Sequence, residues 1–210
     1  MAAMTGDPVA EYWNSNVAHH PLVLDAVPAG CRSALDVGCG DGLLAMKLAE
    51  RAPRVVGIDL DAGMVEQARR RVGGEDVELI RGDFLAAVRG GLLVPGSFDF
   101  VCSVTVIHHM DFDAALAAMA RLVAPGGTLF VVGIARNRSV LDLLIGAAAF
   151  PLLLAIRRFH GGKSAPKGMP VKDATMTYAE TEAATLRILP DAVWRRRLHV
   201  RYTIEWTAPR

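Results

Sequence analysis

Short runs of apolar, mostly β-branched residues alternate along the chain with longer segments in which apolar residues recur every three or four positions. The short runs predict β-strands and the longer segments predict amphipathic helices. The predicted strands are residues 33–37, 54–60, 77–81, 98–104 and 128–134, and the helices between them include residues 43–51, 63–72 and 113–123. Strands that alternate with helices of this length form βαβ units. The pattern therefore predicts an α/β fold with a doubly wound parallel sheet.

The pattern changes after the fifth predicted strand. A strongly apolar stretch covers residues 140–156, and a helix is predicted at about residues 178–189. From Leu198 to Trp206 apolar and polar residues alternate strictly, which predicts a strand with one buried and one solvent-exposed face. Residues 192–196 are a candidate hairpin partner for that strand, although no Asn-Gly or Gly-Gly turn joins the two segments.

Composition narrows the class of protein. The 210 residues are 52% hydrophobic, which excludes a disordered chain and fits one large domain. The formal net charge is +1, so no general electrostatic field would attract a nucleic acid. The three cysteines form no CxxC pair, and the N-terminus lacks the basic start and apolar run of a signal peptide. We therefore expect a cytoplasmic protein without a nucleic-acid partner.

The clearest chemical signal follows the first predicted strand, in the segment Asp36-Val37-Gly38-Cys39-Gly40-Asp41-Gly42. Its glycines allow a sharp turn and a close approach of the backbone to a ligand. The third glycine comes two residues after the second, instead of the three residues of the dinucleotide fingerprint. The carboxylates of Asp36 and Asp41 would repel a pyrophosphate and attract an ammonium or sulfonium group. The loop thus favours a cationic nucleoside ligand over NAD.

Further acids follow the next two predicted strands. Asp59 ends the second strand, 19 residues after Gly40, where an acid can accept hydrogen bonds from both hydroxyls of a ribose. Asp61 is expected only to cap the helix that follows. Asp83 comes after the third strand, where its carboxylate would accept from an adenine amino group beside the apolar Phe84. The alternative for Asp83 is an ordinary loop acid that faces solvent.

Taken together, these segments resemble the class I S-adenosylmethionine-dependent methyltransferases over roughly residues 34–133. The matching segments are LDVGCGDG (35–42), VVGIDLD (55–61), RGDF (81–84), FDFVCSVTVIHHM (98–110) and APGGTLFVV (124–132). The resemblance implies a Rossmann-like sheet of seven strands with an antiparallel last strand. It also implies an enzyme whose cofactor is S-adenosylmethionine and which transfers the methyl group by in-line displacement.

By the same resemblance, each part of the cofactor has its own residues. Asp36 and the turn Gly38-Cys39-Gly40 would hold the methionine part, and Asp59 would hold the ribose. The remaining cofactor-binding residues would be Leu60, Met64, Asp83 and Phe84 at the adenine and Ser103 after the fourth strand.

The segment from Ser103 to Met110 would line the methyl-transfer site. It lacks the Asn/Asp-Pro-Pro-Tyr of many enzymes that methylate nitrogens in nucleic acids and proteins, and also the metal-binding carboxylates of the catechol-type enzymes. We therefore expect a small, hydrophobic metabolite as acceptor and no metal. His108 and His109 are the candidate general base, because an imidazole titrates near neutral pH. Helix capping and packing are the alternative for this pair.

The chain is expected to form a single domain, residues 1–210, with an N-terminal lid (1–33) and an insert over the substrate site (136–176). Within the insert, the apolar stretch 140–156 is shorter than the roughly 20 residues of a membrane span, and it contains Pro151. We therefore predict that it covers the acceptor and does not cross a membrane. A dimer contact through the same surface is the alternative.

Other clusters of charge have ordinary structural explanations. Arg69-Arg70-Arg71 ends a predicted helix, where solvated cations oppose the helix dipole. The arginines 195–197 are expected to form a charged sheet edge. In the N-terminal segment, Tyr12 or His20 would line the lid, and packing is the alternative for the His19-His20 pair.

Two functions from other classes stay open. A protein of this fold can bind S-adenosylmethionine without catalysis and act as a regulator. An NAD(P)-dependent reductase would use a similar glycine turn to hold a dinucleotide. No motif in the sequence identifies the acceptor. The sequence therefore predicts neither the acceptor nor the oligomeric state of the protein.

Overall fold

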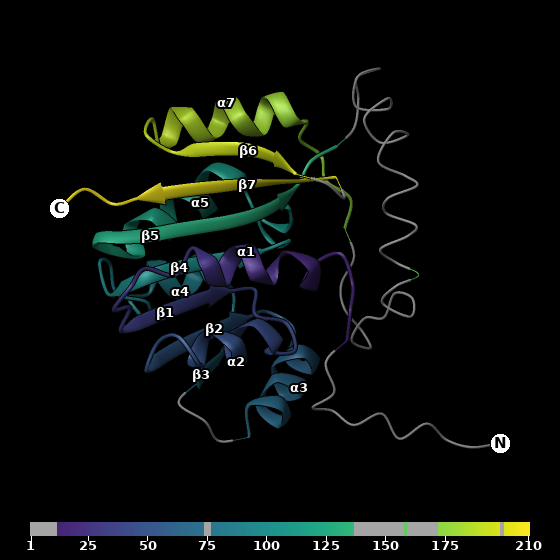
Figure 1. Ribbon diagram of the computed structural model, residues 1–210, viewed down its shortest axis with the longest axis vertical. Helices are drawn as coiled ribbons and strands as arrows, with labels where there is room; N and C mark the ends of the chain where they lie inside the picture. Colours follow the sequence, from purple (N-terminus) through teal and green to yellow (C-terminus); the bar gives the residue numbers. More distant parts are fainter. Residues whose placement is uncertain (1–11, 74–76, 137–157, 159–171, 198–199) are drawn as a thin grey trace.

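The computed structural model describes residues 12–73, 77–136, 158, 172–197 and 200–210 (Figure 1). Its centre is a seven-stranded sheet with the strand order β3-β2-β1-β4-β5-β7-β6. The strands are β1 (Ser33–Val37), β2 (Arg54–Asp59), β3 (Val77–Arg81), β4 (Phe98–Val104), β5 (Val123–Ile134), β6 (Val193–Arg197) and β7 (Arg201–Thr207). Neighbours among β1 to β5 are parallel, while β7 runs antiparallel to β5 and β6. The predicted doubly wound α/β sheet with an antiparallel last strand is confirmed.

Helices lie on both faces of this sheet (Figure 1). The described helices are α1 (His20–Asp25), α2 (Leu43–Ala49), α3 (Ala62–Val72), α4 (Phe84–Arg89), α5 (Phe112–Leu122) and α7 (Tyr178–Ile188), with the 3₁₀ turns η1 (Val17–His19) and η2 (Ile107–His109). One hydrophobic core lies between the sheet and helices α1 and α2. A second core lies on the opposite face of the sheet, under helices α4, α5 and α7. Helix α3 packs against α2 and against strands β2 and β3.

The helices begin where the sequence supplies caps. The carboxylates of Asp61, Asp83 and Asp111 each accept a hydrogen bond from the backbone N–H three residues later, at 2.8, 2.7 and 2.8 Å. Thr177 and Glu180 form a reciprocal capping box at the start of α7. Such caps satisfy N–H groups that have no partner inside the helix. The predicted capping role of Asp61 is confirmed.

The predicted hairpin at the C-terminal end is confirmed, but the prediction that one face of its last strand is exposed to solvent is wrong. The polar side chains of β7 were expected to face solvent, yet Arg201 and Thr203 are only 8% and 1% exposed. The reason is that β7 lies inside the sheet and the N-terminal segment covers this face. Arg201 donates a hydrogen bond to Asn16 Oδ1 at 2.9 Å and another to Ser15 Oγ at 3.3 Å.

The fifth strand also starts earlier than the sequence predicts. The pattern places its first residue at Thr128, after a turn, whereas β5 begins at Val123, which pairs with Phe98. The register shifts between Phe98 and Phe100, and Gly126 takes a positive φ of 75°. A bulge of this kind accommodates the Pro-Gly-Gly sequence inside a strand, which explains the difference.

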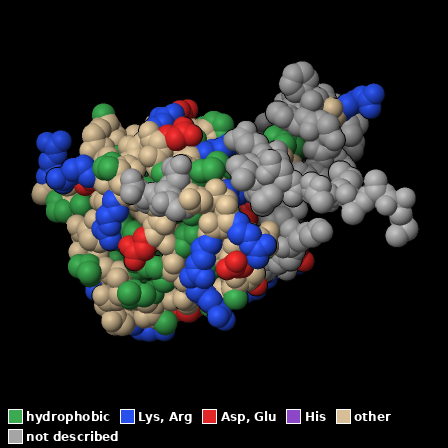
Figure 2. All heavy atoms as spheres, turned by 90° about the horizontal axis from the view of Figure 1, so that it is seen from below, with side chains coloured by type: hydrophobic (Ala, Val, Ile, Leu, Met, Phe, Trp, Pro, Cys, Tyr) green, Lys and Arg blue, Asp and Glu red, His purple; other side chains and the backbone are tan. Residues whose placement is uncertain are grey.

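The arginines of β6 form the predicted charged edge. Arg195 pairs with Glu205 at 3.1 Å, and Arg197 donates to Thr203 Oγ1 at 3.1 Å. The guanidinium of Arg196 lies 4.1 Å from the centre of the Tyr178 ring. Acidic, basic and hydrophobic side chains are interspersed over the face of the molecule that Figure 2 shows.

Among the described helices, none is both long enough and apolar enough to span a membrane. The apolar stretch 140–156 lies outside the described residues, as do residues 1–11 of the expected lid and most of the insert.

Candidate cofactor and acceptor site

The residues singled out in the sequence meet at one edge of the sheet. This edge carries the C-terminal ends of the parallel strands β1 to β5 and the N-terminal end of β7. In sheets of this type, ligands bind outside the carboxyl ends of the strands. The fold therefore brings the glycine loop, Asp59 and the segment after β4 to the same place.

The glycine loop makes a tight turn that other residue types would not allow. Gly38, Gly40 and Gly42 have positive φ angles of 75°, 54° and 79°. A Cβ on Gly38 would lie 2.3 Å from the Val106 side chain, whereas no described atom lies within 4 Å of a Gly40 Cβ. Gly38 is thus required for packing, and Gly40 leaves the backbone open to a ligand.

Asp59 joins this loop to β2. Its Oδ2 accepts a hydrogen bond from the Gly40 N–H at 2.9 Å, and its Oδ1 accepts one from the Asp61 N–H at 2.8 Å. Each carboxylate oxygen keeps a further lone pair after these bonds. The side chain is partly exposed, so it can both fix the loop and accept hydrogen bonds from a ligand.

Asp36 is a buried acid at the end of β1. Its Oδ1 accepts a weak hydrogen bond from the Cys102 thiol at 3.8 Å, and its Oδ2 has no hydrogen-bond partner among the described residues. Burial, followed by repulsion from Asp59, raises the pKa of Asp36 to about 7. A buried acid of this kind is stabilised as a carboxylate when a cation binds beside it.

Asp41 is not available for the cationic ligand that its position in the loop predicted. Its Oδ2 lies 2.7 Å from Nη2 of Arg71, in an ion pair whose side chains are only 6% and 8% exposed. Its Oδ1 accepts a hydrogen bond from the Tyr12 hydroxyl at 3.1 Å. The interpretation of Arg71 as a solvated helix end was wrong as well, since α3 turns this arginine inward while Arg70 stays exposed.

The residues expected at the adenine are placed very differently from one another. Leu60 is 68% exposed beside Asp59, while Met64 and Phe84 are only 2% and 5% exposed. Asp83 is exposed, and its Oδ1 accepts from the Ala86 N–H as the cap of α4. Cys39 is buried next to Gly57, so the loop reaches a ligand there through its backbone.

The segment after β4 carries features that the sequence did not indicate. The Ser103 hydroxyl is buried and donates to the Val37 carbonyl at 2.9 Å, so it holds β1 to β4. Thr105 has a φ of 62°, which is rare and costly for a β-branched residue. No sequence pattern marks such a conformation.

The two candidate bases lie side by side on η2, with ring centres 4.3 Å apart. Burial and the proximity of His109 lower the pKa of His108 to about 4, against the smaller opposing effect of a hydrogen bond with the Lys172 backbone. Burial also lowers the pKa of His109. The buried Nδ1 of His108 has no hydrogen-bond partner among the described residues. The His108 imidazole is therefore uncharged near neutral pH, and the lowered pKa makes it a weaker base than an ordinary histidine.

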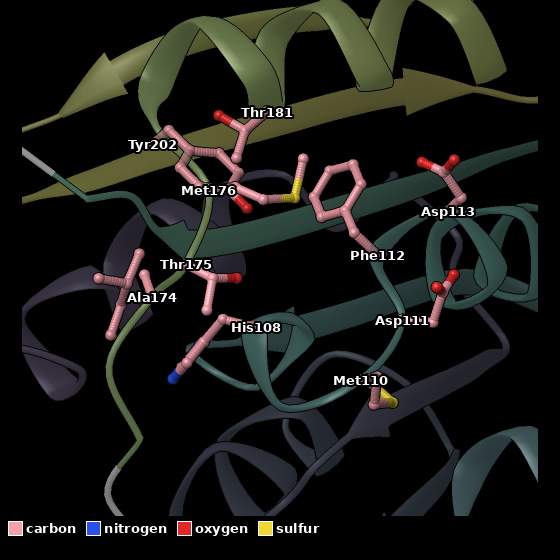
Figure 3. Close-up of a pocket in the computed structure, with 11 residues that line it drawn as sticks. His108, Met110, Asp111, Phe112, Asp113, Ala174, Thr175, Met176, Thr181 and Tyr202 are labelled. Carbon is pink, nitrogen blue, oxygen red and sulfur yellow. The ribbon is translucent and has the colours of Figure 1, made fainter. Parts of the chain in front are cut away.

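A cavity of about 350 Å³ opens next to His108 (Figure 3). It is lined by His108, Met110, Asp111, Phe112, Asp113, Ile134, Ala174, Thr175, Met176, Thr181 and Tyr202. Three of the polar side chains in this wall already have partners: Asp111 caps α5, Asp113 pairs with Arg187 at 2.6 Å, and Thr181 donates to the Tyr178 carbonyl at 2.8 Å. The wall of the cavity is thus a mixture of polar and apolar side chains, and several of its polar groups are already engaged within the protein.

No group of three or more His, Cys, Asp or Glu side chains that would hold a metal ion occurs within the described ranges. In the N-terminal segment, His19 and His20 are 5% and 6% exposed, and Nδ1 of His19 lies 2.8 Å from the Ser15 carbonyl oxygen. This arrangement agrees with the packing alternative for the pair.

Comparisons with known proteins decide the family. A model of the methyltransferase domain matches residues 35–131. The chain is 36% identical over 201 residues to the uncharacterized methyltransferase Rv0089 of Mycobacterium tuberculosis, and this match covers 94% of the chain and 98% of that relative. The chain belongs to the class I S-adenosylmethionine-dependent methyltransferases. This methyltransferase therefore uses S-adenosylmethionine as its cofactor, and the regulator and reductase alternatives give way to an enzyme.

Other comparisons agree with this assignment. The methyltransferase is 33% identical over 164 residues to a ubiquinone biosynthesis O-methyltransferase of Thiobacillus denitrificans, covering 71% of this chain and 68% of the relative. Its fold is similar to that of the N-methyltransferase NodS from Bradyrhizobium japonicum WM9 in complex with S-adenosyl-L-homocysteine, with a TM-score of 0.59 at 18% identity over 92% of this chain and 87% of that one. A putative S-adenosylmethionine-dependent methyltransferase from Listeria monocytogenes gives a TM-score of 0.63 at 16% identity, over 94% of this chain and 100% of that one. At these identities the solved structures support the fold.

Proposed function

We propose that this methyltransferase methylates a hydroxyl group of a small, largely apolar molecule that binds in the cavity beside His108. The observation that carries the proposal is the cavity itself, which places the apolar side chains of Met110, Ile134 and Met176 in one wall with an imidazole directly after β4. The relative named as an O-methyltransferase supports oxygen as the methylated atom. Apolar pockets with few polar groups are typical of sites for small molecules.

The residues of the cofactor side fit S-adenosylmethionine. Bound there, the cofactor supplies an electrophilic methyl group on a sulfonium centre. Asp36, whose Oδ2 lacks a partner among the described residues, would hold the positively charged methionine part together with the open backbone at Gly40. Asp59 would accept hydrogen bonds from the ribose through its remaining lone pairs.

The adenine would lie against the exposed Leu60. Asp83 has one carboxylate oxygen that is not used by its cap and would accept from the adenine amino group. Met64 and Phe84 would shape the apolar floor from below, because their side chains are buried. Ser103 would act by holding β1 to β4, and Cys39 by its backbone.

His108 would remove the proton of the acceptor hydroxyl through its imidazole, while His109 stays a neighbour that lowers its pKa. Since the sulfonium is already a good leaving group, the chain contributes chiefly by alignment and by excluding water from the reacting atoms. General base catalysis adds to this only for an acceptor that loses a proton.

The single-domain organisation over residues 1–210 is part of the same proposal. The contact of Tyr12 with Asp41 supports an N-terminal lid (1–33) over the glycine loop. Residues 174–176, which line the cavity, support an insert (136–176) that covers the acceptor. We propose that the enzyme acts in the cytoplasm, with no nucleic acid and no membrane as partner.

The test is a transfer assay with S-adenosylmethionine labelled in its methyl group. The purified enzyme is incubated with matched sets of alkylphenols, alkylanilines, alkylthiols, an oligonucleotide mixture and a protein lysate. We expect label in the extracted phenols, in equal molar amount to the S-adenosylhomocysteine that is formed. Label that enters only the nitrogen, sulfur or macromolecular fractions would overturn the proposal.

A further inference from the structure

One polar group in the wall of the cavity has no role so far. Tyr202 lies on β7 directly opposite Gly133 of β5. The residue is only 1% exposed, but its ring ends at the cavity. Figure 3 shows the hydroxyl end of the ring pointing into the cavity, near the side chain of Met176.

Gly133 determines this position of the ring. A Cβ at residue 133 would lie 2.1 Å from Cζ and 2.2 Å from the hydroxyl oxygen of Tyr202. The phenol therefore crosses the β5 backbone at the one place where no side chain stands. Gly133 has no positive φ that would require glycine for its own backbone. A glycine inside a strand weakens the strand, so its benefit here is the space that it leaves for the phenol.

The other side of the ring is fixed as well. Trp194 of β6 stacks on Tyr202 with ring centres 5.7 Å apart and planes 18° apart. Tyr178 packs edge-on against Trp194, with ring centres 6.1 Å apart. The hydroxyl is thus held at the end of a rigid aromatic stack, which is the condition for orienting a ligand.

The hydroxyl itself makes no hydrogen bond within the described part of the chain, unlike Asp111, Asp113 and Thr181 in the same wall. A hydroxyl at the cavity wall that has no protein partner keeps its donor for a bound ligand. Burial also raises the pKa of Tyr202, so the group stays protonated and can donate.

We propose that Tyr202 is a substrate-positioning residue, which donates a hydrogen bond to an oxygen atom of the acceptor molecule. The acceptor is then an apolar compound with two oxygens, one that faces His108 and is methylated and one that Tyr202 holds. This inference rests on the proposed function, because it assigns the same cavity to the acceptor. It adds the second oxygen, which selects the hydroxyl that is methylated.

The test uses three probes of equal shape, 4-butylcatechol, 4-butylphenol and butylbenzene, which carry two, one and no oxygens. Their affinities are measured by calorimetry for the full chain saturated with S-adenosylhomocysteine. Tyr202→Phe keeps the ring on Gly133 and on Trp194 and removes only the hydroxyl. We expect this variant to bind 4-butylcatechol about 3- to 10-fold more weakly, with an unchanged affinity for butylbenzene and an unchanged Tm.

Two further variants separate positioning from packing. Tyr178→Phe makes the same chemical change at the other end of the stack, beyond Trp194 and away from the cavity wall, and should leave all three affinities unchanged. Gly133→Ala should displace the phenol and weaken binding of 4-butylcatechol as much as Tyr202→Phe does. The double variant, Gly133→Ala with Tyr202→Phe, should bind 4-butylcatechol no more weakly than whichever single variant has the lower affinity.

Equal affinities of the wild type and Tyr202→Phe for 4-butylcatechol would overturn the role of Tyr202 and leave the proposed function intact. An equal loss of affinity for butylbenzene would also overturn it, because the hydroxyl would then act through packing. Failure of the wild type to bind any of the three probes would overturn the proposed apolar acceptor site and this inference with it.

Discussion

The ends of β1, β2 and β3 and the ends of β4, β5 and β7 lie along the same edge of the sheet, but they use their polar groups in opposite ways. On the cofactor side, the carboxylate of Asp59 holds the backbone of the glycine loop, and Asp41 is paired with Arg71. On the acceptor side, Nδ1 of His108 and the Tyr202 hydroxyl have no hydrogen bond within the described residues, and both residues belong to a cavity wall of polar and apolar side chains. These two acids on the cofactor side are thus held in place by bonds within the protein. The two groups on the acceptor side have no protein partner among the described residues.

The largest effect on affinity is expected for Asp59, because the same carboxylate holds the glycine loop and is proposed to bind the cofactor. Asp59→Ala should weaken binding of S-adenosylmethionine by about 10²- to 10⁴-fold, because the two charge-assisted hydrogen bonds proposed between Asp59 and the ribose would be lost. Calorimetric titration measures the affinity. Asp61→Ala is the matched control, since it should remove about 1 kcal/mol of helix-cap stability and leave the affinity near that of the wild type. Equal affinities of the wild type and Asp59→Ala for S-adenosylmethionine would contradict the role of Asp59 in binding the cofactor.

On the acceptor side, His108→Gln should lower kcat by about 10²- to 10⁴-fold while binding of S-adenosylmethionine is kept. His109→Gln is the control and should change kcat by much less. Because the folded pKa of His108 is about 4, the wild-type rate should not fall between pH 8 and pH 5 through this group. A loss below tenfold in His108→Gln would leave alignment as the only contribution of this segment.

The same histidine should influence stability. Its pKa is lower in the folded chain than the usual 6.5, so the unfolded chain binds the proton more readily and protonation favours unfolding. The contribution of His108 to the free energy of unfolding should therefore decrease as pH falls from about 6.5 to about 4, and it should be constant below that range. Urea titrations of the wild type and His108→Gln across this range would show a smaller decrease in the variant.

The buried pair on the cofactor side should be sensitive to loss of its cation. Arg71→Ala should reduce the free energy of unfolding by about 3–5 kcal/mol, because Asp41 would remain buried without its partner. Arg70→Ala, which removes the neighbouring exposed arginine, should cost less than about 1 kcal/mol. Urea denaturation of both variants is the measurement. Similar values for the two would contradict the buried position of Arg71.

A smaller effect is expected from the titration of Asp36. Below its pKa of about 7 the acid is neutral and attracts a cation less, so the affinity for S-adenosylmethionine should fall as pH is lowered. The decrease should be at most about tenfold per pH unit. In the apo protein, the contribution of the Asp36 carboxyl to stability should instead decrease as pH rises from about 4 to about 7, since the folded state binds this proton more tightly, and it opposes the contribution of His108. Asp36→Asn should bind weakly and lose this pH dependence of affinity.

The contrast between the two sides also explains what the sequence could predict. The residues of the cofactor side belong to short segments at strand ends, so local patterns were sufficient for the glycine loop and Asp59. Arg71 was misjudged because its partner is 30 residues away and the run of arginines resembles a solvated helix end. The distance between Asp41 and Arg71 in the chain hides a contact that only the packing of α3 creates.

The acceptor side was less predictable for a physical reason. Its wall combines the segment after β4 with residues 174–176 and with Tyr202 of β7, which both come more than sixty residues later in the chain. The alternation in β7 indicated correctly that Tyr202 is buried. It did not indicate that the hydroxyl reaches the cavity, because this depends on Gly133 in the neighbouring strand. A tyrosine paired with a strand glycine is the signal that would have marked it.

The contact between Gly38 and Val106 has a consequence for how such enzymes diversify. Val106 belongs to the segment that carries His108, yet it occupies the space where a side chain of residue 38 would stand. We therefore expect lineages that acquire new acceptors to vary Met110, Ile134 and Met176 freely, while Gly38 is retained because of its positive φ and its contact with Val106. A change of substrate is thus expected through substitutions in the wall of the cavity, and not through substitutions at the contact between Gly38 and Val106.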